Sequence, residues 1–161
     1  MQMRSEKGVT LAALILTVLI LAVLTAVTAT EIGEMMGKVH LETISTDLML
    51  IQAKAKVIAE KVNFNDDESL LKGQKLSEVT ENETINNLLA LGVMNESEEH
   101  YDDYYVWNKE TIDELDLGIT DVKDSEFFIV NYETEEVIYS VGYEHEDGVT
   151  YYKLSEIMEL E

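Results

Sequence analysis

The stretch that decides the fold is VTLAALILTVLILAVLTAVTAT, residues 9 to 30, which carries no charge over 22 positions. As a helix it is roughly 33 Å long, about the thickness of the hydrocarbon core of a bilayer. The basic residues Arg4 and Lys7 precede it, and acidic residues begin at Glu31. Because basic residues stay on the cytoplasmic side, the stretch predicts a membrane-spanning helix with its N-terminus inside and its C-terminus outside.

Two other interpretations of this stretch stay open. The apolar core of a cleavable signal peptide is usually ~7–15 residues long, which is shorter than this one. Ala26 and Ala29 nevertheless offer small residues for a cleavage site. The remaining possibility is an ordinary membrane anchor, and the residues that follow help to separate it from a more specific role.

Beyond Glu31 the helical pattern continues to about Val62 as an amphipathic stretch. Its apolar residues recur at alternating steps of three and four, which places them on one face of a helix; they are Leu41, Ile44, Leu48, Ile51, Ala55, Ile58 and Val62. We expect the polar residues Glu42, Asp47, Gln52, Lys56 and Glu60 on the opposite face. One helix from Val9 to Val62 is therefore predicted, with weak points at Gly33 and Gly37, since each glycine costs ~1 kcal/mol in helix propensity.

Residues 63 to 161 predict a small α+β domain that begins with two short helices. TENETINNLLALG is typical of a helix with a capping box of Thr80 and Glu83 and a stop at Gly92. NKETIDELDLG is typical of a second helix, with Asn108 as its cap and Gly118 as its stop.

The end of the chain predicts an antiparallel sheet. EFFIVNY and VIYSVGY flank the turn ETEE, and a turn at Asp147-Gly148 leads into TYYK. These segments give three strands, and YYVW at residues 104 to 107 is a candidate fourth. A last short helix with Ser155 as its cap follows. The sheet is the available partner for the apolar stripe of residues 41 to 62.

The charge is divided sharply along the chain. Residues 1 to 8 carry a net charge of +1, whereas the rest holds 32 acidic and 9 basic side chains. So acidic a domain repels nucleic acid, and we expect no nucleic-acid contact. The chain has no cysteine, so it has neither disulfides nor thiolate metal sites. No nucleophile motif or phosphate-binding loop is present, and we expect no enzymatic activity.

Two clusters of carboxylates are candidate calcium ligands, because calcium prefers hard oxygen donors. Asp66 and Asp67 form one, and Asp102 and Asp103 form the other. Neither follows the EF-hand pattern, so ordinary solvated loops remain the alternative. The histidines His40, His100 and His145 are scattered without metal-ligand spacing.

A short leader ending in Lys7-Gly8, followed by Val9-Thr10-Leu11 and a long helix that becomes amphipathic, resembles the type IV pilin and pseudopilin family. The resemblance implies that a prepilin peptidase cuts after Gly8 and that Val9 becomes the methylated first residue. Thr10, Leu11, Ala13 and Leu14 would then begin the assembly helix. It also implies the pilin fold, in which the long helix packs on a small antiparallel sheet.

The chain departs from the family at one important position. The family usually has glutamate as the fifth mature residue, where it pairs with the N-terminal amine of a neighbour, and this chain has Ala13. Some minor pseudopilins and many pilin-like proteins of Gram-positive bacteria lack this glutamate too. Ala13 therefore leaves open whether the chain would be a major or a minor pilin.

The resemblance implies four segments: a cytoplasmic leader (1–8), a transmembrane and filament-core helix (9–30), its amphipathic continuation (31–62) and an acidic extracellular head (63–161). The precursor would lie in the cytoplasmic membrane, in contact with lipid, and later in a filament on the cell surface. Its partners would be copies of itself or other pilins, prepilin peptidase and the assembly machinery. The alternative is an uncleaved single-pass protein that displays an acidic binding domain.

Overall fold

The computed structural model describes the backbone of residues 6–79, 82–94 and 103–160, and between residues 6 and 36 it describes few side chains. The chain divides into two compact units, residues 1–40 and residues 41–161. The second unit contains a helix packed on a sheet, so the chain is an α+β protein, as predicted.

Helix α1 covers Glu6–Asn65 and includes both predicted helical segments. It begins three residues before the predicted start and ends three residues after the predicted end, and both Gly33 and Gly37 are helical. Within the described residues we find no helix that is both long enough and apolar enough to cross a membrane. The predicted span, residues 9–30, consists mostly of residues whose side chains lie outside the described part, so the span stays a prediction.

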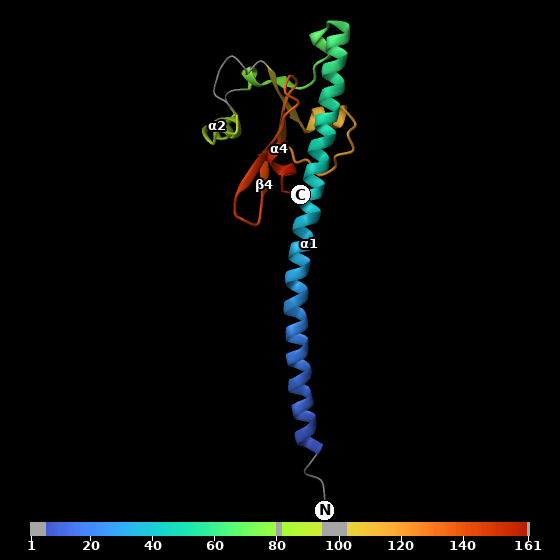
Figure 1. The fold of residues 1–161 in the computed structure, drawn as a ribbon, viewed down its shortest axis with the longest axis vertical. Coiled ribbons are helices and arrows are strands. Elements are labelled where there is room, and N and C mark those ends of the chain that lie inside the picture. Colours follow the sequence, from blue (N-terminus) through green and yellow to red (C-terminus); the bar gives the residue numbers. More distant parts are fainter. Residues whose placement is uncertain (1–5, 80–81, 95–102, 161) are drawn as a thin grey trace, which may run out of the picture. The chain divides into compact units, whose positions relative to one another are not determined.

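The sheet has five antiparallel strands that follow one another in chain order. Figure 1 shows the sheet beside the second half of α1. They are β1 (Gln74–Lys75), β2 (Tyr104–Asn108), β3 (Phe127–Asn131), β4 (Val137–Glu144) and β5 (Thr150–Lys153). The three predicted strands and the candidate fourth are confirmed. Strand β1 was not predicted; it pairs Gln74 with Val106 and Lys75 with Tyr105.

In the described residues, three short helices and two 3-10 turns lie before, between and after the strands: α2 (Glu83–Ala90), α3 (Lys109–Glu114), α4 (Leu154–Met158), η1 (Glu68–Leu70) and η2 (Leu76–Glu78). The predicted cap of α3 is confirmed, because Asn108 Oδ1 accepts a hydrogen bond from Thr111 N at 3.0 Å. Helix α3 ends at Glu114, however, well before the predicted stop at Gly118.

The two other predicted caps are wrong. Asn82 caps α2, because its Oδ1 accepts a hydrogen bond from Thr84 N at 2.9 Å; Thr80 lies outside the described residues. Helix α4 begins at Leu154, so Ser155 is inside it, and the Ser155 hydroxyl donates to Glu136 Oε2 at 2.8 Å. The predicted stop of α2 is confirmed at Gly92, which follows the helix with a φ of 70°.

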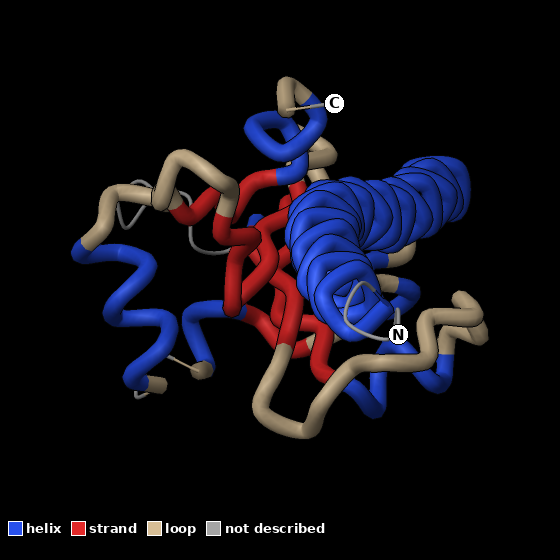
Figure 2. Tube along the Cα trace, turned by 90° about the horizontal axis from the view of Figure 1, so that it is seen from below, coloured by secondary structure: helices blue, strands red, loops and turns tan. Residues whose placement is uncertain are grey.

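The sheet has a helix on each face, and Figure 2 shows the strands (red) between α1 and a shorter helix. Side chains alternate along the strands between two apolar clusters, as the pleat requires. Trp107, Phe128 and Val130 face the second half of α1. Val106 and Ile129 face the other way, toward Ile85 and Leu88 of α2 and its flanking loop. The central strand β3 is buried along its whole length.

The predicted apolar stripe of α1 is confirmed. Its members belong to the cluster between α1 and the sheet: Leu41, Leu48, Ile51, Ala55 and Ile58 are buried, and Ile44 and Val62 are partly buried against them. Two residues of the predicted opposite face contact the turn after β3, although Lys56 stays exposed. Gln52 Nε2 donates to Glu135 O at 2.8 Å, and Lys56 pairs with the Glu135 carboxylate at 2.9 Å. These two side chains flank the stripe and hold α1 to the turn between β3 and β4.

Candidate functional site

The predicted processing and assembly residues lie in the first part of α1. The backbone at Gly8, Val9, Thr10, Leu11 and Ala13 is helical, while the side chains at these positions lie outside the described residues. The structure therefore leaves their predicted roles as predictions.

Four side chains are described in the first part of α1, and three of them are apolar and exposed to solvent. Leu14 is 62% exposed, and Ile15 and Val18 are exposed to a similar degree. Thr17 Oγ1 donates to Leu14 O at 2.9 Å, so its hydroxyl is satisfied within the helix. This part of the helix thus exposes the apolar side chains of Leu14, Ile15 and Val18 to solvent.

Among the described residues, the candidate calcium ligands are not gathered into one site. Asp67 caps η1: its Oδ1 accepts hydrogen bonds from Ser69 N at 3.0 Å and Ser69 Oγ at 2.6 Å, and these bonds lower the pKa of Asp67. Asp66 adopts a positive φ of 53° in the turn before it. Asp102 lies outside the described residues. Among the described side chains, no group of three or more His, Cys, Asp or Glu residues is placed to hold a metal ion, and Asp103 belongs to none.

A groove of ≈ 660 Å³ lies between the end of α1, the segment around η1 and the loops of β2 and β3. Its charged lining contains five acidic and two basic side chains: Glu60, Glu68, Asp103, Glu133, Glu135, Lys56 and Lys75. The excess of carboxylates favours cations over anions in this groove. Because the ion pair with Glu135 already engages Lys56, the groove offers no cluster of lysines to an anionic ligand.

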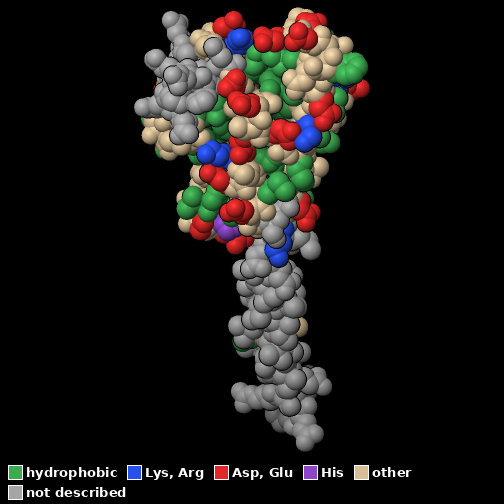
Figure 3. All heavy atoms as spheres, turned by 45° about the horizontal axis from the view of Figure 1, so that its top comes forward, with side chains coloured by type: hydrophobic (Ala, Val, Ile, Leu, Met, Phe, Trp, Pro, Cys, Tyr) green, Lys and Arg blue, Asp and Glu red, His purple; other side chains and the backbone are tan. Residues whose placement is uncertain are grey.

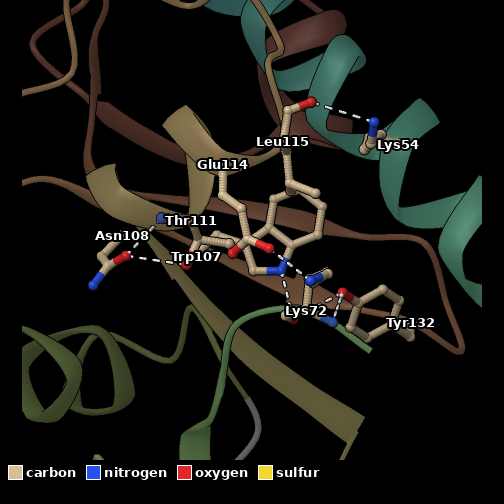
Figure 4. Close-up of polar contacts among 8 residues, drawn as sticks. All are labelled: Lys54, Lys72, Trp107, Asn108, Thr111, Glu114, Leu115 and Tyr132. Carbon is tan, nitrogen blue, oxygen red and sulfur yellow. Dashed lines mark hydrogen bonds and ion pairs between the residues drawn. The ribbon is translucent and has the colours of Figure 1, made fainter. Parts of the chain in front are cut away.

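Beside this groove, the buried Trp107 and the partly buried Tyr132 bind the backbone of Lys72 (Figure 4). Lys72 O accepts hydrogen bonds from Trp107 Nε1 at 2.9 Å and from Tyr132 Oη at 2.8 Å. Lys72 N donates to Tyr132 Oη at 3.0 Å. Burial raises the pKa of the Tyr132 phenol to about 12. These bonds fix β1 beside β2.

The next residue, Gly73, can only be a glycine in this arrangement. Its φ is 90°, and an added Cβ would lie 2.5 Å from Trp107 Cδ1 and 2.7 Å from Val106 O. No local sequence pattern indicates the contacts at Lys72 and Gly73, since a lone Lys-Gly pair has no periodicity and the partners of Lys72 are 35 and 60 residues away along the chain.

The acidic side chains of the head are spread over its surface, and Figure 3 shows one face with carboxylates (red) around a few lysines (blue). Glu126 is the buried exception; Lys123 Nζ lies 2.9 Å from its Oε1. Burial raises the pKa of Glu126, but the hydrogen bonds and charge of Lys123 outweigh burial and hold that pKa below its ordinary value. Partial burial and the charge of Asp121 raise the pKa of Asp47. Lys123 therefore favours the ionised form of Glu126, whereas burial and Asp121 disfavour the ionised form of Asp47.

Comparisons of the chain with protein-family models, with curated proteins and with solved structures find no match.

Proposed function

We propose that the chain is a structural subunit of a type IV pilus-like or pseudopilus filament. The proposal rests on two observations taken together, one from the sequence around Gly8 and one from the packing of α1. The junction Lys7-Gly8-Val9-Thr10-Leu11 leads directly into a helix, and the second half of that helix buries its apolar stripe on an antiparallel sheet. The same order of leader, apolar helix and sheet-packed amphipathic helix characterises the pilin family.

In this proposal residues 9–30 have two successive environments. Before assembly they lie in the cytoplasmic membrane, and after cleavage behind Gly8 they pack with the same residues of neighbouring subunits. Exposed apolar side chains such as Leu14, Ile15 and Val18 support this, because their transfer from water into a bilayer or a helix bundle is favourable.

Ala13 makes apolar packing the main source of assembly energy. With no carboxylate between Val9 and Thr30, no ion pair to a neighbour's terminal amine sets the register of the bundle. An intramembrane carboxylate is costly, so its absence also stabilises the precursor in lipid. The subunit depends on prepilin peptidase, on the assembly machinery and on copies of itself or of other pilins.

The acidic heads face outward from the filament core and give the surface its charge. The alternative, an uncleaved anchored protein that displays an acidic domain, shares the membrane helix but needs neither cleavage nor assembly. The filament subunit and the anchored protein differ in whether the chain is cut after Gly8.

The test compares the wild-type chain with Gly8→Val, which replaces the residue before the cut, and with Ser5→Ala as a control in the same leader. We expect the wild type and Ser5→Ala in filaments sheared from the cell surface, and Gly8→Val only in the membrane fraction at its uncut mass. Equal amounts of all three variants in the sheared filaments would contradict processing at Gly8. Absence of all three from sheared material would favour the anchored alternative.

A further inference from the structure

The hairpin of β4 and β5 ends in a tip, residues 143–151, at one end of the sheet (Figure 1). Strand β5 lies at the edge of the described sheet, next to β4. The pairing of these two strands is irregular between Ile138 and Tyr143, so the pairs at the tip are separated from those at the other end of the hairpin. A short ladder at a sheet edge opens locally more readily than the centre of a sheet, and the contacts within the turn therefore decide how often the tip opens.

The Asp147 carboxylate organises this turn. Its Oδ1 accepts a hydrogen bond from Val149 N at 2.8 Å, and its Oδ2 accepts one from Tyr151 Oη at 3.0 Å. Two backbone bonds close the turn: His145 N donates to Val149 O, and Gly148 N donates to His145 O, both at 2.9 Å. The bond from Val149 N, followed by that from Tyr151, lowers the pKa of Asp147, so this carboxylate stays ionised in mildly acidic solution.

His145 places an unsatisfied nitrogen beside this carboxylate. Among the described residues, its Nδ1 is the one buried side-chain nitrogen or oxygen atom without a hydrogen-bond partner. It lies 3.4 Å from Asp147 Oδ1, which is longer than the roughly 2.7–3.2 Å of an ordinary N–H···O hydrogen bond. The rings of Tyr143 and Tyr151 flank the imidazole, with centroids 6.3 and 6.2 Å away. A buried polar atom without a partner is costly, so a change that turns the contact with Asp147 into a bond stabilises the tip.

The charges around the imidazole are mainly negative. Besides Asp147, carboxylates lie beside the ring on the hairpin and on the helices that pack against the hairpin strands: Glu144, Glu146, Asp47 of α1, Glu83 of α2 and Glu156 of α4. Of the nearby lysines, Lys153 lies at the other end of β5, and Lys123, just before β3, forms an ion pair with Glu126. A positive charge on the ring is therefore attracted rather than repelled by most of its surroundings.

We propose that His145 is a proton switch in the hairpin tip: in mildly acidic solution its protonated Nδ1 pairs with Asp147 and stabilises the turn, and in alkaline solution this pair is lost. Protonation makes both ring nitrogens donors, and a carboxylate oxygen that accepts one hydrogen bond has a lone pair for a second. Because the charged histidine is the form that gains a partner on folding, the stabilisation is present at low pH and is lost as the pH rises. It is lost again in stronger acid, where Asp147 takes up a proton. The inference concerns the hairpin alone and holds whether or not the chain enters filaments.

The test is hydrogen exchange of the full chain in detergent, measured at about pH 5 and about pH 8, on either side of the range in which histidine ordinarily titrates. The readout is the protection factor of the amides at His145, Gly148 and Val149, whose hydrogen bonds close the turn. A protection factor divides the intrinsic exchange rate by the observed one, so the direct effect of pH on exchange cancels. The amide of Ile129, a fully buried residue in the central strand, is the internal reference for changes in the whole domain.

Three variants isolate the pair. His145→Gln removes the group that takes up the proton, and Asp147→Asn removes the charge but keeps Oδ1 as an acceptor for Val149 N. The matched control is His40→Gln, which replaces an exposed histidine on α1. The double variant of His145 and Asp147 completes a cycle that measures the coupling between the two side chains at each pH.

We expect the protection of the tip, relative to Ile129, to rise about two- to fivefold from pH 8 to pH 5 in the wild type and in His40→Gln, which is the range for a partly exposed ion pair. The rise should vanish in His145→Gln and in Asp147→Asn, and the coupling should be present at pH 5 and absent at pH 8. Equal relative protection of the wild type at both pH values would overturn the inference.

A rise that persists in His145→Gln would also overturn it, because the acidic side chains alone would then explain the effect of pH. A rise that persists in Asp147→Asn would assign the effect to the general negative charge of the domain and not to this pair. The comparison of the wild type with His145→Gln and His40→Gln does not use Asp147→Asn, so it decides the inference even where the asparagine variant unfolds the turn.

Discussion

The packing of α1 on the sheet makes a quantitative prediction for Leu48→Ala. Leu48 is 0% exposed in the cluster between α1 and the sheet. The substitution removes three carbon groups, which at about 0.8 kcal/mol each lowers the free energy of unfolding by about 2.4 kcal/mol. Incomplete closure of the resulting cavity raises the loss to about 3–4 kcal/mol. At roughly 4 °C per kcal/mol for a domain of this size, the Tm should fall by about 12–16 °C.

The matched control is Leu50→Ala, two residues away on the opposite face. Leu50 is 43% exposed, so its truncation should change the free energy of unfolding by no more than about 0.5 kcal/mol. The assay is thermal unfolding of the full chain in detergent, followed by near-ultraviolet circular dichroism, which reports on the buried Trp107 and its neighbouring tyrosines. Equal shifts for the two variants, or a loss below about 1 kcal/mol for Leu48→Ala, would refute the assignment of the buried face.

Three further predictions follow from the head and its charge. Gly73→Ala should lower the free energy of unfolding by more than about 1 kcal/mol, because a Cβ at a φ of 90° meets Trp107; chemical denaturation that finds it neutral would contradict the contact. Burial raises the pKa of Tyr132 to about 12, above its value near 10 in the unfolded chain, so its contribution is complete below about pH 10 and is lost as the pH rises toward 12. Wild type should therefore lose stability more steeply over this range than Tyr132→Phe, and parallel curves would argue against the buried phenol. Filaments should become more stable from 0.01 M to 1 M salt, because the Debye length falls from about 30 to about 3 Å and repulsion between the acidic heads is screened. The assay is pelleting of filaments with a chelator present. Equal pelleting at both salt concentrations would show that repulsion between heads does not limit filament stability.

The parts of the fold that follow from local sequence patterns were predicted well. The stripe of α1 is visible because its period of three and four is a property of neighbouring residues, and it is buried as expected. The Asn108 cap of α3 was predicted for a similar reason, since an asparagine directly before a short amphipathic stretch is a local pattern typical of a helix N-cap. The turn at Asp147-Gly148 lies between β4 and β5, where the sequence placed it.

Apart from the caps of α2 and α4 and the end of α3, which are local, the errors concern contacts made over long distances in the chain. Strand β1 has two residues and no periodicity, and it exists because Trp107 and Tyr132 bind the backbone at Lys72. Lys56 is exposed as expected, but its ion pair with Glu135 could not be predicted because Glu135 lies far along the chain. Leu50, Val57 and Phe64 recur with a period of seven on the same helix, and the stronger pattern of the buried stripe masks this period in the sequence.

The central claim is that this chain is a processed filament subunit, and the mass of its N-terminal peptide tests it most directly. The protein is recovered from filaments sheared from intact cells, and its first peptide is sequenced by mass spectrometry. The account predicts a chain that begins at Val9 and carries a methyl group on its terminal amine. A surface chain that still begins at Met1, or one that begins near Thr30, would contradict it.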